Sequence, residues 1–483
     1  MRIIPILTVL GFLILAVGIS MLAAVGVSLW YEEPDLQPIL VSSLISIGVG
    51  TCLIVFLKRL QREELRPREG FAIVTFGWLI IPLFGSLPFL LSGTIPHFTD
   101  AYFETVSGFT TTGASILTDV EKLPHGLLFW RSLTHWLGGM GIIVLSLAIL
   151  PLLGIGGMQL FKAEVAGPTK DKLTPRVAET ARLLWGLYVL VTAVEAILLV
   201  AGGMSWFDAV CHSFSTIASG GFSTKNASIG YYQSAYVDWV VTFFMFVAGT
   251  NFALHYSALR GRLAGYLKDN EFVFFVVTFV VSVVLVASVI GGDMYGGNVS
   301  QSLRYSAFNI MSVMSCTGFA TADFARWAPL AQVVLLFLLF PGACAGSTGG
   351  AMKNIRVLLL LKAAVNELKK LIHPKAVIPV RYNGRTVEQD VLFTVAGFII
   401  LYLVTFATGT ILMTAFGLDL VTSLSSVATC MANCGPGLGA VGPMANYAHL
   451  PSMAKWVLDA CMIIGRLELF TVFVLFNRSF WKS

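Results

Sequence analysis

The stretch Thr110-Thr111-Thr112-Gly113-Ala114 ends an apolar segment that is too short to span a membrane, and three later stretches repeat this arrangement. They are Ala218-Ser219-Gly220-Gly221-Phe222, Ser315-Cys316-Thr317-Gly318-Phe319 and Asn433-Cys434-Gly435-Pro436-Gly437. The four stretches lie about 100 residues apart, and a recurrence at a regular interval indicates internal repeats of one structural unit. We therefore expect four similar units arranged around one axis.

Each short segment before a glycine covers about a dozen residues, which as a helix would rise roughly 18 Å. The hydrocarbon core of a bilayer is about 30 Å thick, so such a helix can enter the membrane without crossing it. Irregular backbone at that depth persists only where it is buried in protein or lines a wet cavity. Four such loops facing one axis predict a cation pore, in which backbone carbonyls replace the water around an ion.

The candidate filter residues are each glycine and the two residues before it. They are Thr111, Thr112, Gly113, Ala218, Ser219, Gly220, Cys316, Thr317, Gly318, Asn433, Cys434 and Gly435. No acidic residue stands at these positions, and neutral oxygens suit a large monovalent cation better than Mg²⁺ or Ca²⁺, which prefer carboxylates. Close helix packing also explains any single glycine, so the hypothesis depends on the joint pattern.

The short helices carry candidate capping residues where they begin. Asp100, Asp208 and Asp419 stand at three of these starts, and Ser300 or Ser302 is the candidate in the third unit. Side-chain oxygens of Asp and Ser satisfy the free N–H groups of a first helical turn. With these starts outward, the helix C-termini point inward, where their partial negative charge favours a cation.

The composition predicts an all-α integral membrane protein. Hydrophobic residues make up 56% of the 483 residues and charged residues 12%, with a mean hydropathy of +0.82. Soluble domains carry about 25% charged residues. The first apolar run, from Ile3 to Trp30, is too long for a cleavable signal and is expected to be a retained helix.

The basic residues predict the orientation. Most of the 31 Lys and Arg residues fall on one side of the expected spans, and the largest group lies between Lys353 and Arg385. Basic loops stay in the cytoplasm, so we expect this loop and both chain termini to be cytoplasmic. The net charge of +5 is explained in this way by topology and does not predict nucleic-acid binding.

The expected organisation is two N-terminal transmembrane helices over residues 1–65 followed by four pore repeats. The repeats cover residues 66–162, 163–265, 266–370 and 371–483. Each repeat comprises a spanning helix, a short pore helix with its filter loop, and a second spanning helix. The expected second helices cover residues 125–160, 235–262, 328–362 and 452–477.

Two features of these second helices are unusual at membrane depth. The third is interrupted by Pro341-Gly342-Ala343-Cys344-Ala345-Gly346-Ser347-Thr348-Gly349-Gly350, and a proline with several glycines does not stay helical. The interruption predicts unwound backbone lining a cavity, with a packing kink as the alternative. Arg466 lies inside the fourth, where a charge is costly and usually functional. We expect Arg466 to face the pore; snorkelling or a salt bridge to another helix, such as Glu195, is the alternative.

Five stretches carry a resemblance to a known family. They are SGFTTTGAS (107–115), HSFSTIASGGFST (212–224), CAGSTGG (344–350), NCGPGLG (433–439) and GRLELFT (465–471). On these the chain resembles the potassium-transporting subunits of bacterial Trk systems, within the Trk/Ktr/HKT superfamily. The resemblance covers essentially the whole chain and implies transport of K⁺, and of Rb⁺, across the bacterial inner membrane.

The resemblance also implies a gate and partners. An intramembrane loop below the filter would gate conduction, and its residues here are Gly342, Gly346, Ser347, Thr348, Gly349 and Gly350. Relatives carry an arginine in the role expected for Arg466. Family members are homodimers, and a cytosolic ring of nucleotide-binding (TrkA-like) subunits regulates them. The basic loop itself predicts contacts with membrane lipid, and no organic cofactor is expected in this chain.

Three other functions were weighed against a potassium channel. A symporter coupling K⁺ to H⁺ or Na⁺ stays open, because nothing in the residues separates it from a channel. A membrane enzyme requires a cluster of metal ligands or a nucleophile with its base, whereas the seven cysteines and seven histidines are dispersed. A purely structural membrane subunit would leave the four non-spanning glycine loops unexplained.

Overall fold

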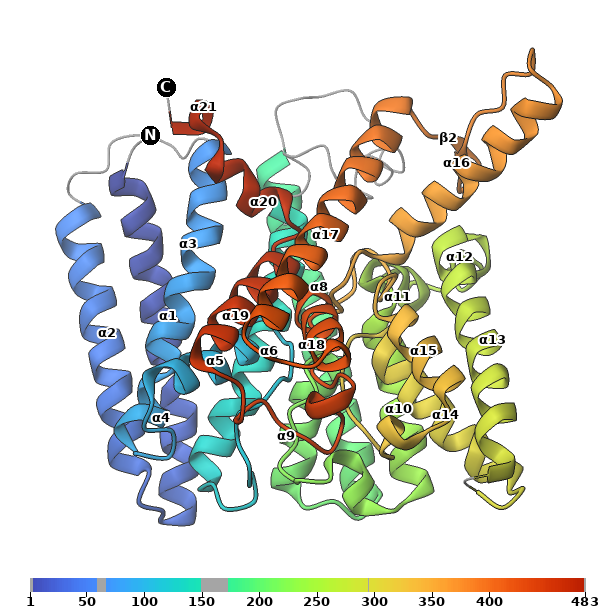
Figure 1. Ribbon diagram of the computed structural model, residues 1–483. Helices are drawn as coiled ribbons and strands as arrows, with labels where there is room; N and C mark the ends of the chain where they lie inside the picture. Colours follow the sequence, from blue (N-terminus) through green and yellow to red (C-terminus); the bar gives the residue numbers. More distant parts are fainter. Residues whose placement is uncertain (1–2, 59–66, 149–172, 294, 482–483) are drawn as a thin grey trace.

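The computed structural model in Figure 1 describes residues 3–58, 67–148, 173–293 and 295–481. These residues are mostly helical, and six helical segments among them are long and apolar enough to cross a membrane. They lie in α1 (Ile3–Tyr31), α2 (Leu36–Lys58), α3 (Pro67–Gly85) with the short α4 (Leu87–Leu91), α8 (Leu173–Ala201), α13 (Asn270–Asp293) and α17 (Gln389–Ala415). The expected class, an all-α multi-pass membrane protein, is confirmed.

Four short helices stand where the pore helices were expected. They are α5 (Phe98–Phe109), α9 (Trp206–Ile217), α14 (Val299–Met314) and α18 (Leu420–Ala432). The longest has 16 residues, which corresponds to a rise of about 24 Å, less than the hydrocarbon core. Most of their side chains are buried, so these helices lie inside the protein and are shielded from lipid.

The second helices of the repeats differ in how far they continue. They are α6 (His125–Ala148), α10 (Ala235–Gly249) with α11 (Phe252–Leu259), α15 (Pro329–Leu338) with α16 (Asn354–Ile372), and α19 (Ser452–Arg466) with α20 (Phe470–Phe473). The predicted interruption of the helix expected over residues 328–362 is confirmed and spans residues 339–353, between α15 and α16. The expected extension of the first to residue 160 lies outside the described residues.

For two of the second helices, the prediction of a continuous helix was wrong. The helix expected over residues 235–262 bends by 102° between α10 and α11. Asn251 caps α11 by accepting from the backbone N–H of Ala253. The last helix ends at Arg466, because Glu468 and Leu469 have positive φ angles of 56° and 48°. Arg466 is therefore the final residue of α19 and does not lie in the middle of a continuous span.

The caps of the short helices also differ from expectation. Only Asp419 acts as predicted, accepting from the backbone N–H of Thr422. The cap of α9 is Ser205 and that of α14 is Asn298. Asp100 lies in the first turn of α5 without capping it and accepts from Lys455 on α19, so this carboxylate joins two elements.

The remaining elements are short and lie in the connections between helices. They are α12 (Ala264–Lys268), α21 (Arg478–Trp481), η1 (Ser228–Tyr232), η2 (Phe324–Arg326), η3 (Gly439–Val441), η4 (Val474–Phe476), β1 (Arg381–Tyr382) and β2 (Arg385–Thr386). β1 and β2 form an antiparallel hairpin, which the sequence analysis did not predict. Its turn residues Asn383 and Gly384 both have positive φ, as two-residue hairpin turns require.

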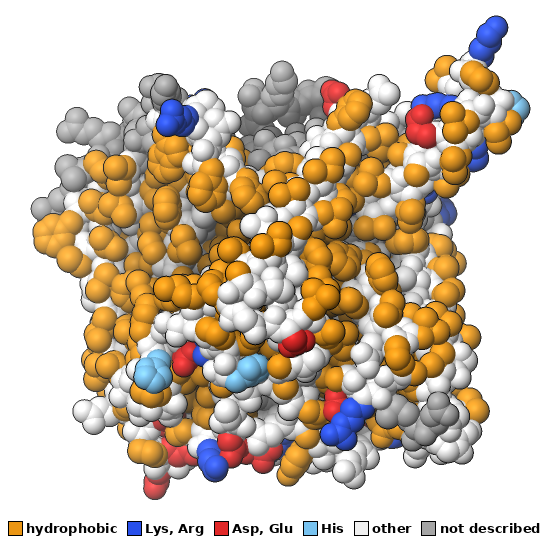
Figure 2. Space-filling model, viewed as in Figure 1, with side chains coloured by type: hydrophobic (Ala, Val, Ile, Leu, Met, Phe, Trp, Pro, Cys, Tyr) orange, Lys and Arg blue, Asp and Glu red, His pale blue; other side chains and the backbone are white. Residues whose placement is uncertain are grey.

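Polar and apolar surfaces are arranged as a bilayer requires. Figure 2 shows hydrophobic side chains over most of the visible face, with many of the charged side chains toward its two ends. Figure 1 shows both termini at the same end as the β-hairpin and the outer part of α16. The largest buried clusters contain side chains from all four short helices, which places the loops that follow them near the centre of the molecule.

Candidate functional site

The four short helices end in the same backbone turn. In the first, the N–H of Thr111 donates to the oxygen of Gly108, and the N–H of Thr112 donates to that of Ser107. The same pair of bonds starts from Ser219 and Gly220, from Cys316 and Thr317, and from Asn433 and Cys434. Thr111, Ser219, Cys316 and Asn433 all have positive φ angles, from 52° to 61°. The repeated turn sets the register in which the four loops correspond.

The repeated turn changes which glycine of the second loop corresponds to the filter glycine of the first. The turn begins at Ser219 in the second loop, so the residue that corresponds to Gly113 is Gly221, one position after the predicted Gly220. Gly113 and Gly221 have nearly equal φ angles of +82° and +79°, a region that glycine occupies without strain. In the same register Ala218 precedes the loop and caps the end of α9.

The four loops touch one another in a closed cycle. A Cβ atom built on the glycine of one loop would lie within 3 Å of the next loop, so no side chain fits between them. Measured from the added Cβ atom, the distance is 2.1 Å at Gly113 to the oxygen of Gly220 and 2.0 Å at Gly221 to the oxygen of Thr317. It is 2.8 Å at Gly318 to Pro436 and 2.6 Å at Gly435 to the oxygen of Gly113. The fourth loop thus returns to the first.

The hydroxyl groups in these loops have different partners. The side chains of Thr112 and Thr317 each bond the hydroxyl of the residue two positions earlier, at 2.8 Å and 2.7 Å. Asn433 donates to Thr112 Oγ1 at 3.1 Å and so joins the fourth loop to the first. Within the described residues, Thr111 Oγ1 is buried and has no hydrogen-bond partner.

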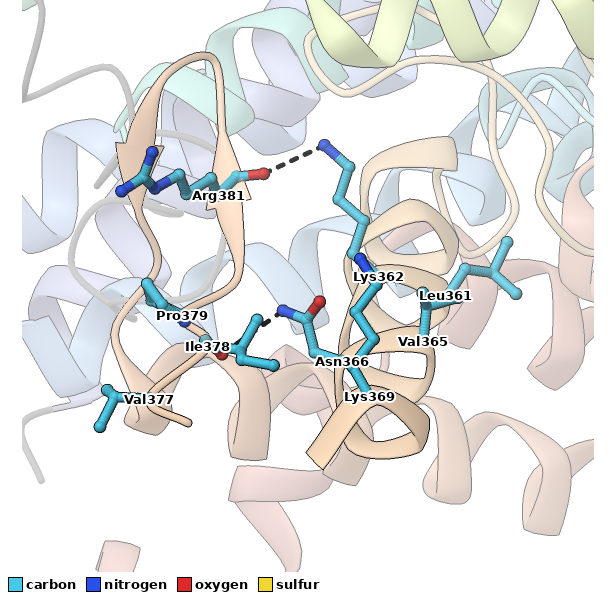
Figure 3. A pocket seen from close by; sticks show the side chains of 9 residues that line it. All are labelled: Leu361, Lys362, Val365, Asn366, Lys369, Val377, Ile378, Pro379 and Arg381. Atoms are coloured by element: carbon cyan, nitrogen blue, oxygen red, sulfur yellow. Dashed lines mark hydrogen bonds between the residues drawn. The ribbon is translucent and has the colours of Figure 1, made fainter. Parts of the chain in front are cut away.

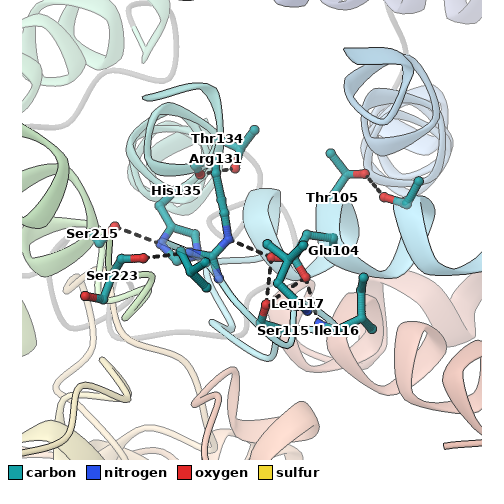
Figure 4. Close-up of polar contacts among 12 residues, drawn as sticks. Glu104, Thr105, Ser115, Ile116, Leu117, Arg131, Thr134, His135, Ser215 and Ser223 are labelled. Atoms are coloured by element: carbon teal, nitrogen blue, oxygen red, sulfur yellow. Dashed lines mark hydrogen bonds and ion pairs between the residues drawn. The ribbon is translucent and has the colours of Figure 1, made fainter. Parts of the chain in front are cut away.

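A buried ion pair supports the first two loops from behind. Glu104 on α5 accepts from Ser115 Oγ and from the backbone N–H of Ile116, just after Gly113, and it pairs with Arg131 Nε at 2.6 Å (Figure 4). The guanidinium of Arg131 reaches the second loop by donating to the oxygen of Ser223 at 3.0 Å. Since Glu104 and Arg131 are 1% and 4% exposed, this pair is shielded from water.

The ring of Phe222 lies between two cationic or polar groups of α6. The Arg131 guanidinium carbon is 3.5 Å from the ring centroid, and the His135 ring stacks on Phe222 with centroids 4.0 Å apart. No role at the site was predicted from the sequence for Arg131, His135 or Phe222. The aromatic residue directly after Gly221 was the available signal.

The interrupted segment 339–353 lies against the inner ends of the short helices. Thr348 Oγ1 bonds the oxygens of Ile217 at 2.9 Å and Ala248 at 3.2 Å, and Ser219 Oγ at 2.7 Å. Cβ atoms built on Gly349 and Gly350 would lie 2.6 Å from the oxygen of Ser315 and 2.2 Å from that of Ala432. The segment therefore contacts the second, third and fourth short helices where they end.

The other predicted gate residues hold the segment in shape. Gly342 lies close to Ala351 and to Cys316 Sγ, and Gly346 lies close to the Asn251 side chain. Ser347 Oγ donates to the oxygen of Cys344. The oxygen of Gly346 accepts from the N–H of Phe252 at 3.1 Å, so the bend between α10 and α11 is shaped around this segment.

Arg466 meets the same segment from α19. Its Nη1 donates to the oxygen of Thr348 at 2.8 Å and its Nη2 to that of Gly138 at 3.4 Å. The side chain is 2% exposed. Both carboxylate oxygens of Glu195 lack a hydrogen-bond partner among the described residues, so the alternative of a salt bridge to Glu195 is wrong, and an exposure of only 2% excludes snorkelling of Arg466 to water. The neighbouring Glu468 pairs with Arg356 on α16.

The described residues contain no group of three or more His, Cys, Asp or Glu side chains that could hold a metal ion. The chemistry of the centre is instead that of closely packed backbone loops with a buried arginine beneath them. Such an arrangement can bind and release a cation.

The comparisons with known proteins agree with this geometry. The family model described as "TrkH: Cation transport protein" matches residues 37–483. This chain belongs to the TrkH family of cation transport proteins. TrkH-family membership makes it a transport protein and excludes the enzyme alternative.

Relatives from three bacteria match the TrkH-family chain over nearly its whole length. This chain is 42% identical over 481 residues to the Trk system potassium uptake protein TrkH of Halomonas elongata, and the match covers 99% of both chains. The Escherichia coli protein of the same name is 41% identical, with 98% of both chains covered. The crystal structure of the potassium transporter TrkH from Vibrio parahaemolyticus matches with a TM-score of 0.91 and 37% identity, covering 100% of both chains.

Proposed function

We propose that this protein takes up potassium ions across the bacterial inner membrane through the ring formed by its four glycine loops. The observation that carries the proposal is the closed cycle of contacts among Gly113, Gly221, Gly318 and Gly435. A cycle of backbone loops at the centre of a membrane protein can surround an ion with neutral oxygens. The names of the relatives, which are potassium uptake proteins, support K⁺ as the ion, and Rb⁺ should follow the same path.

The proposed filter is the set of residues between the repeated turn and each glycine. It comprises Thr111-Thr112-Gly113, Ser219-Gly220-Gly221, Cys316-Thr317-Gly318 and Asn433-Cys434-Gly435. Gly113, Gly221 and Gly318 are partly exposed, whereas the residues just before them are buried. This difference supports a path that opens to water at the glycines and narrows toward the inner side.

The proposed gate is the segment 339–353 together with Arg466. The segment packs against the ends of three short helices, and Arg466 holds the oxygen of Thr348 in place. A buried positive charge below a cation filter raises the energy of an approaching ion. Movement of the segment would therefore require that the Arg466–Thr348 bond breaks.

The orientation and partners extend the same proposal. The basic residues of the α16 region favour a cytoplasmic location for that region and for both termini. A relative named as part of a Trk system implies further components, and we propose a homodimer that a cytosolic ring of nucleotide-binding (TrkA-like) subunits regulates. The division into two N-terminal helices and four repeats is part of the proposal.

The test is uptake of radioactive rubidium into proteoliposomes that contain this chain alone, with unlabelled K⁺ or Na⁺ as competitor. Wild type should show uptake that K⁺ blocks and Na⁺ does not, and Gly113→Ser should lose this difference. Gly48→Ser is the matched control, because Gly48 lies in α2 with no atom near its missing Cβ. Uptake that requires an H⁺ or Na⁺ gradient would establish the symporter. No uptake by wild type or by Arg466→Ala would contradict the proposal.

A further inference from the structure

A cavity lies between the outer part of α16 and the chain that leads into the β-hairpin. Its volume is about 540 Å³. Figure 3 shows the nine residues that line it, which are Leu361, Lys362, Val365, Asn366, Lys369, Val377, Ile378, Pro379 and Arg381. The proposed ion path does not use any of them, although α16 begins directly after the interrupted segment.

Two neighbouring spans fix the depth of this cavity. Lys362 Nζ donates to Asn270 Oδ1 at 3.0 Å and to the backbone oxygen of Arg381 at 3.0 Å. Asn270 is the first residue of the span in α13, and the hairpin leads directly into the span that begins at Gln389. Since both spans begin beside the cavity, it lies at the level of the lipid headgroups, a layer several ångströms thick on each side of the hydrocarbon.

The lining combines cationic and apolar groups. Three of the nine residues are cations and none is acidic. The side chains of Lys369 and Arg381 are exposed, and within the described residues neither makes a side-chain hydrogen bond or ion pair. On the apolar side, Leu361 and Val365 are 51% and 49% exposed and Val377 is 94% exposed, so the lining offers apolar surface that an acyl chain can cover.

A ligand that matches this lining needs a negative group and an apolar chain. Phospholipids with anionic headgroups supply both, and basic residues near a membrane surface attract them. A free phosphate would use the cations but leave the apolar wall uncovered. The structure also separates the roles of the three cations, because Lys362 already bonds two protein oxygens, whereas Lys369 and Arg381 remain free to bind a ligand.

We propose that this cavity binds one anionic phospholipid from the leaflet on the side of the chain termini. The phosphate lies against Lys369, with Arg381 adding positive charge from the far side of the hairpin (Figure 3), and an acyl chain runs along Leu361, Val365 and Val377. Lys362 holds the hairpin to α13 and so keeps the two walls of the cavity together.

The experiment is native mass spectrometry of the full chain in detergent, titrated with phosphatidylglycerol or with phosphatidylcholine of the same acyl chains. The cavity variant is Lys369→Gln with Arg381→Gln. The matched control is Lys370→Gln with Arg385→Gln, which removes the same charge from α16 and from the hairpin without touching the cavity lining, at the cost of the exposed Lys370–Glu367 ion pair. Wild type and control should bind phosphatidylglycerol preferentially, and the cavity variant should bind it about thirtyfold more weakly.

Three results would overturn the proposal. Equal binding by the cavity variant and wild type would show that these cations do not hold a lipid. Equal weakening in the control would show that only net charge matters. Glycerol phosphate that competes as well as the whole lipid would assign the cavity to a soluble phosphate. The same spectra report the number of chains in each particle, so a cavity variant that dissociates without losing lipid preference would mean that a second copy covers the cavity.

Discussion

Arg466, the last residue of α19, donates from Nη1 to the backbone oxygen of Thr348 at 2.8 Å. The bond joins α19 to the interrupted segment 339–353. Through Nη2 the same guanidinium reaches Gly138 on α6. One buried cation therefore connects α19, α6 and the interrupted segment beside the glycine loops, and it is the group whose removal should alter both charge and mobility there.

Replacing Arg466 should increase ion flux. Arg466→Ala removes the positive charge and the donor to Thr348, so we expect rubidium uptake to rise roughly tenfold, equivalent to about 1.4 kcal/mol of barrier. Arg466→Gln keeps a donor without the charge and separates the two effects. If uptake rises in Arg466→Ala but not in Arg466→Gln, the barrier is due to the hydrogen bond. If uptake rises equally in both variants, the barrier is due to the charge. Unchanged uptake by correctly inserted Arg466→Ala would contradict the proposed gate.

The hydroxyl of Thr348 should hold the interrupted segment closed. Thr348→Val keeps the shape of the side chain but loses its bonds to Ile217, Ala248 and Ser219. Each bond contributes about 1 kcal/mol, so basal rubidium uptake should rise while the thermal midpoint falls. Ser347→Ala is the control, because the hydroxyl of Ser347 bonds only within the segment, to Cys344. If Ser347→Ala raises uptake as much as Thr348→Val does, then the closed position depends on the whole segment and not specifically on the hydroxyl of Thr348.

The Glu104–Arg131 pair should stabilise the protein and its selectivity together. Breaking a buried pair from one side costs about 3–5 kcal/mol, so Glu104→Ala should lower the thermal midpoint strongly. It should also weaken the preference for K⁺, because Glu104 holds the backbone of Ile116 and, through Arg131, that of Ser223.

The exposed pair Lys122–Asp119 provides the comparison for this prediction. Lys122→Met removes a surface ion pair and should leave both the midpoint and the preference unchanged, since exposed pairs contribute little. If Glu104→Ala lowers the midpoint but competition by Na⁺ stays weak, then the buried pair supports the fold and has no part in selectivity.

The elements that sequence predicts well here are those that glycine and proline mark directly. The short helices, their glycine loops and the interruption after Leu338 were all readable, because clustered glycines, and glycines with a proline, strongly disfavour a continued helix. The bend after Gly249 was not readable in the same way. It depends on backbone bonds to Cys344 and Gly346, which are distant in the sequence, and tertiary contacts of that kind leave no local pattern.

The site shows the same division between local and tertiary information. The glycines and Arg466 were identified because they are unusual at membrane depth. The sequence did not show which residue of the second loop corresponds to Gly113, since Gly220 and Gly221 are adjacent and both are small. The backbone turn that starts at Ser219, the positive φ of Gly221 and its contact with Thr317 in the next loop distinguish them. Arg131 was not predicted for a related reason, because its partner Glu104 lies on another helix.

The register predicts that Gly221 determines selectivity in the same way as Gly113. A Cβ at Gly221 would lie 2.0 Å from the oxygen of Thr317, so Gly221→Ala must displace the third loop. We expect Na⁺ to compete with rubidium at least tenfold better than in wild type, a change of about 1.4 kcal/mol. Gly203→Ala is the control, because Gly203 has a φ of +91° but no neighbour within 4 Å, so it shares the backbone strain without the contact. If Gly221→Ala and Gly203→Ala both keep the wild-type preference for K⁺ over Na⁺, then Gly221 is not part of the filter.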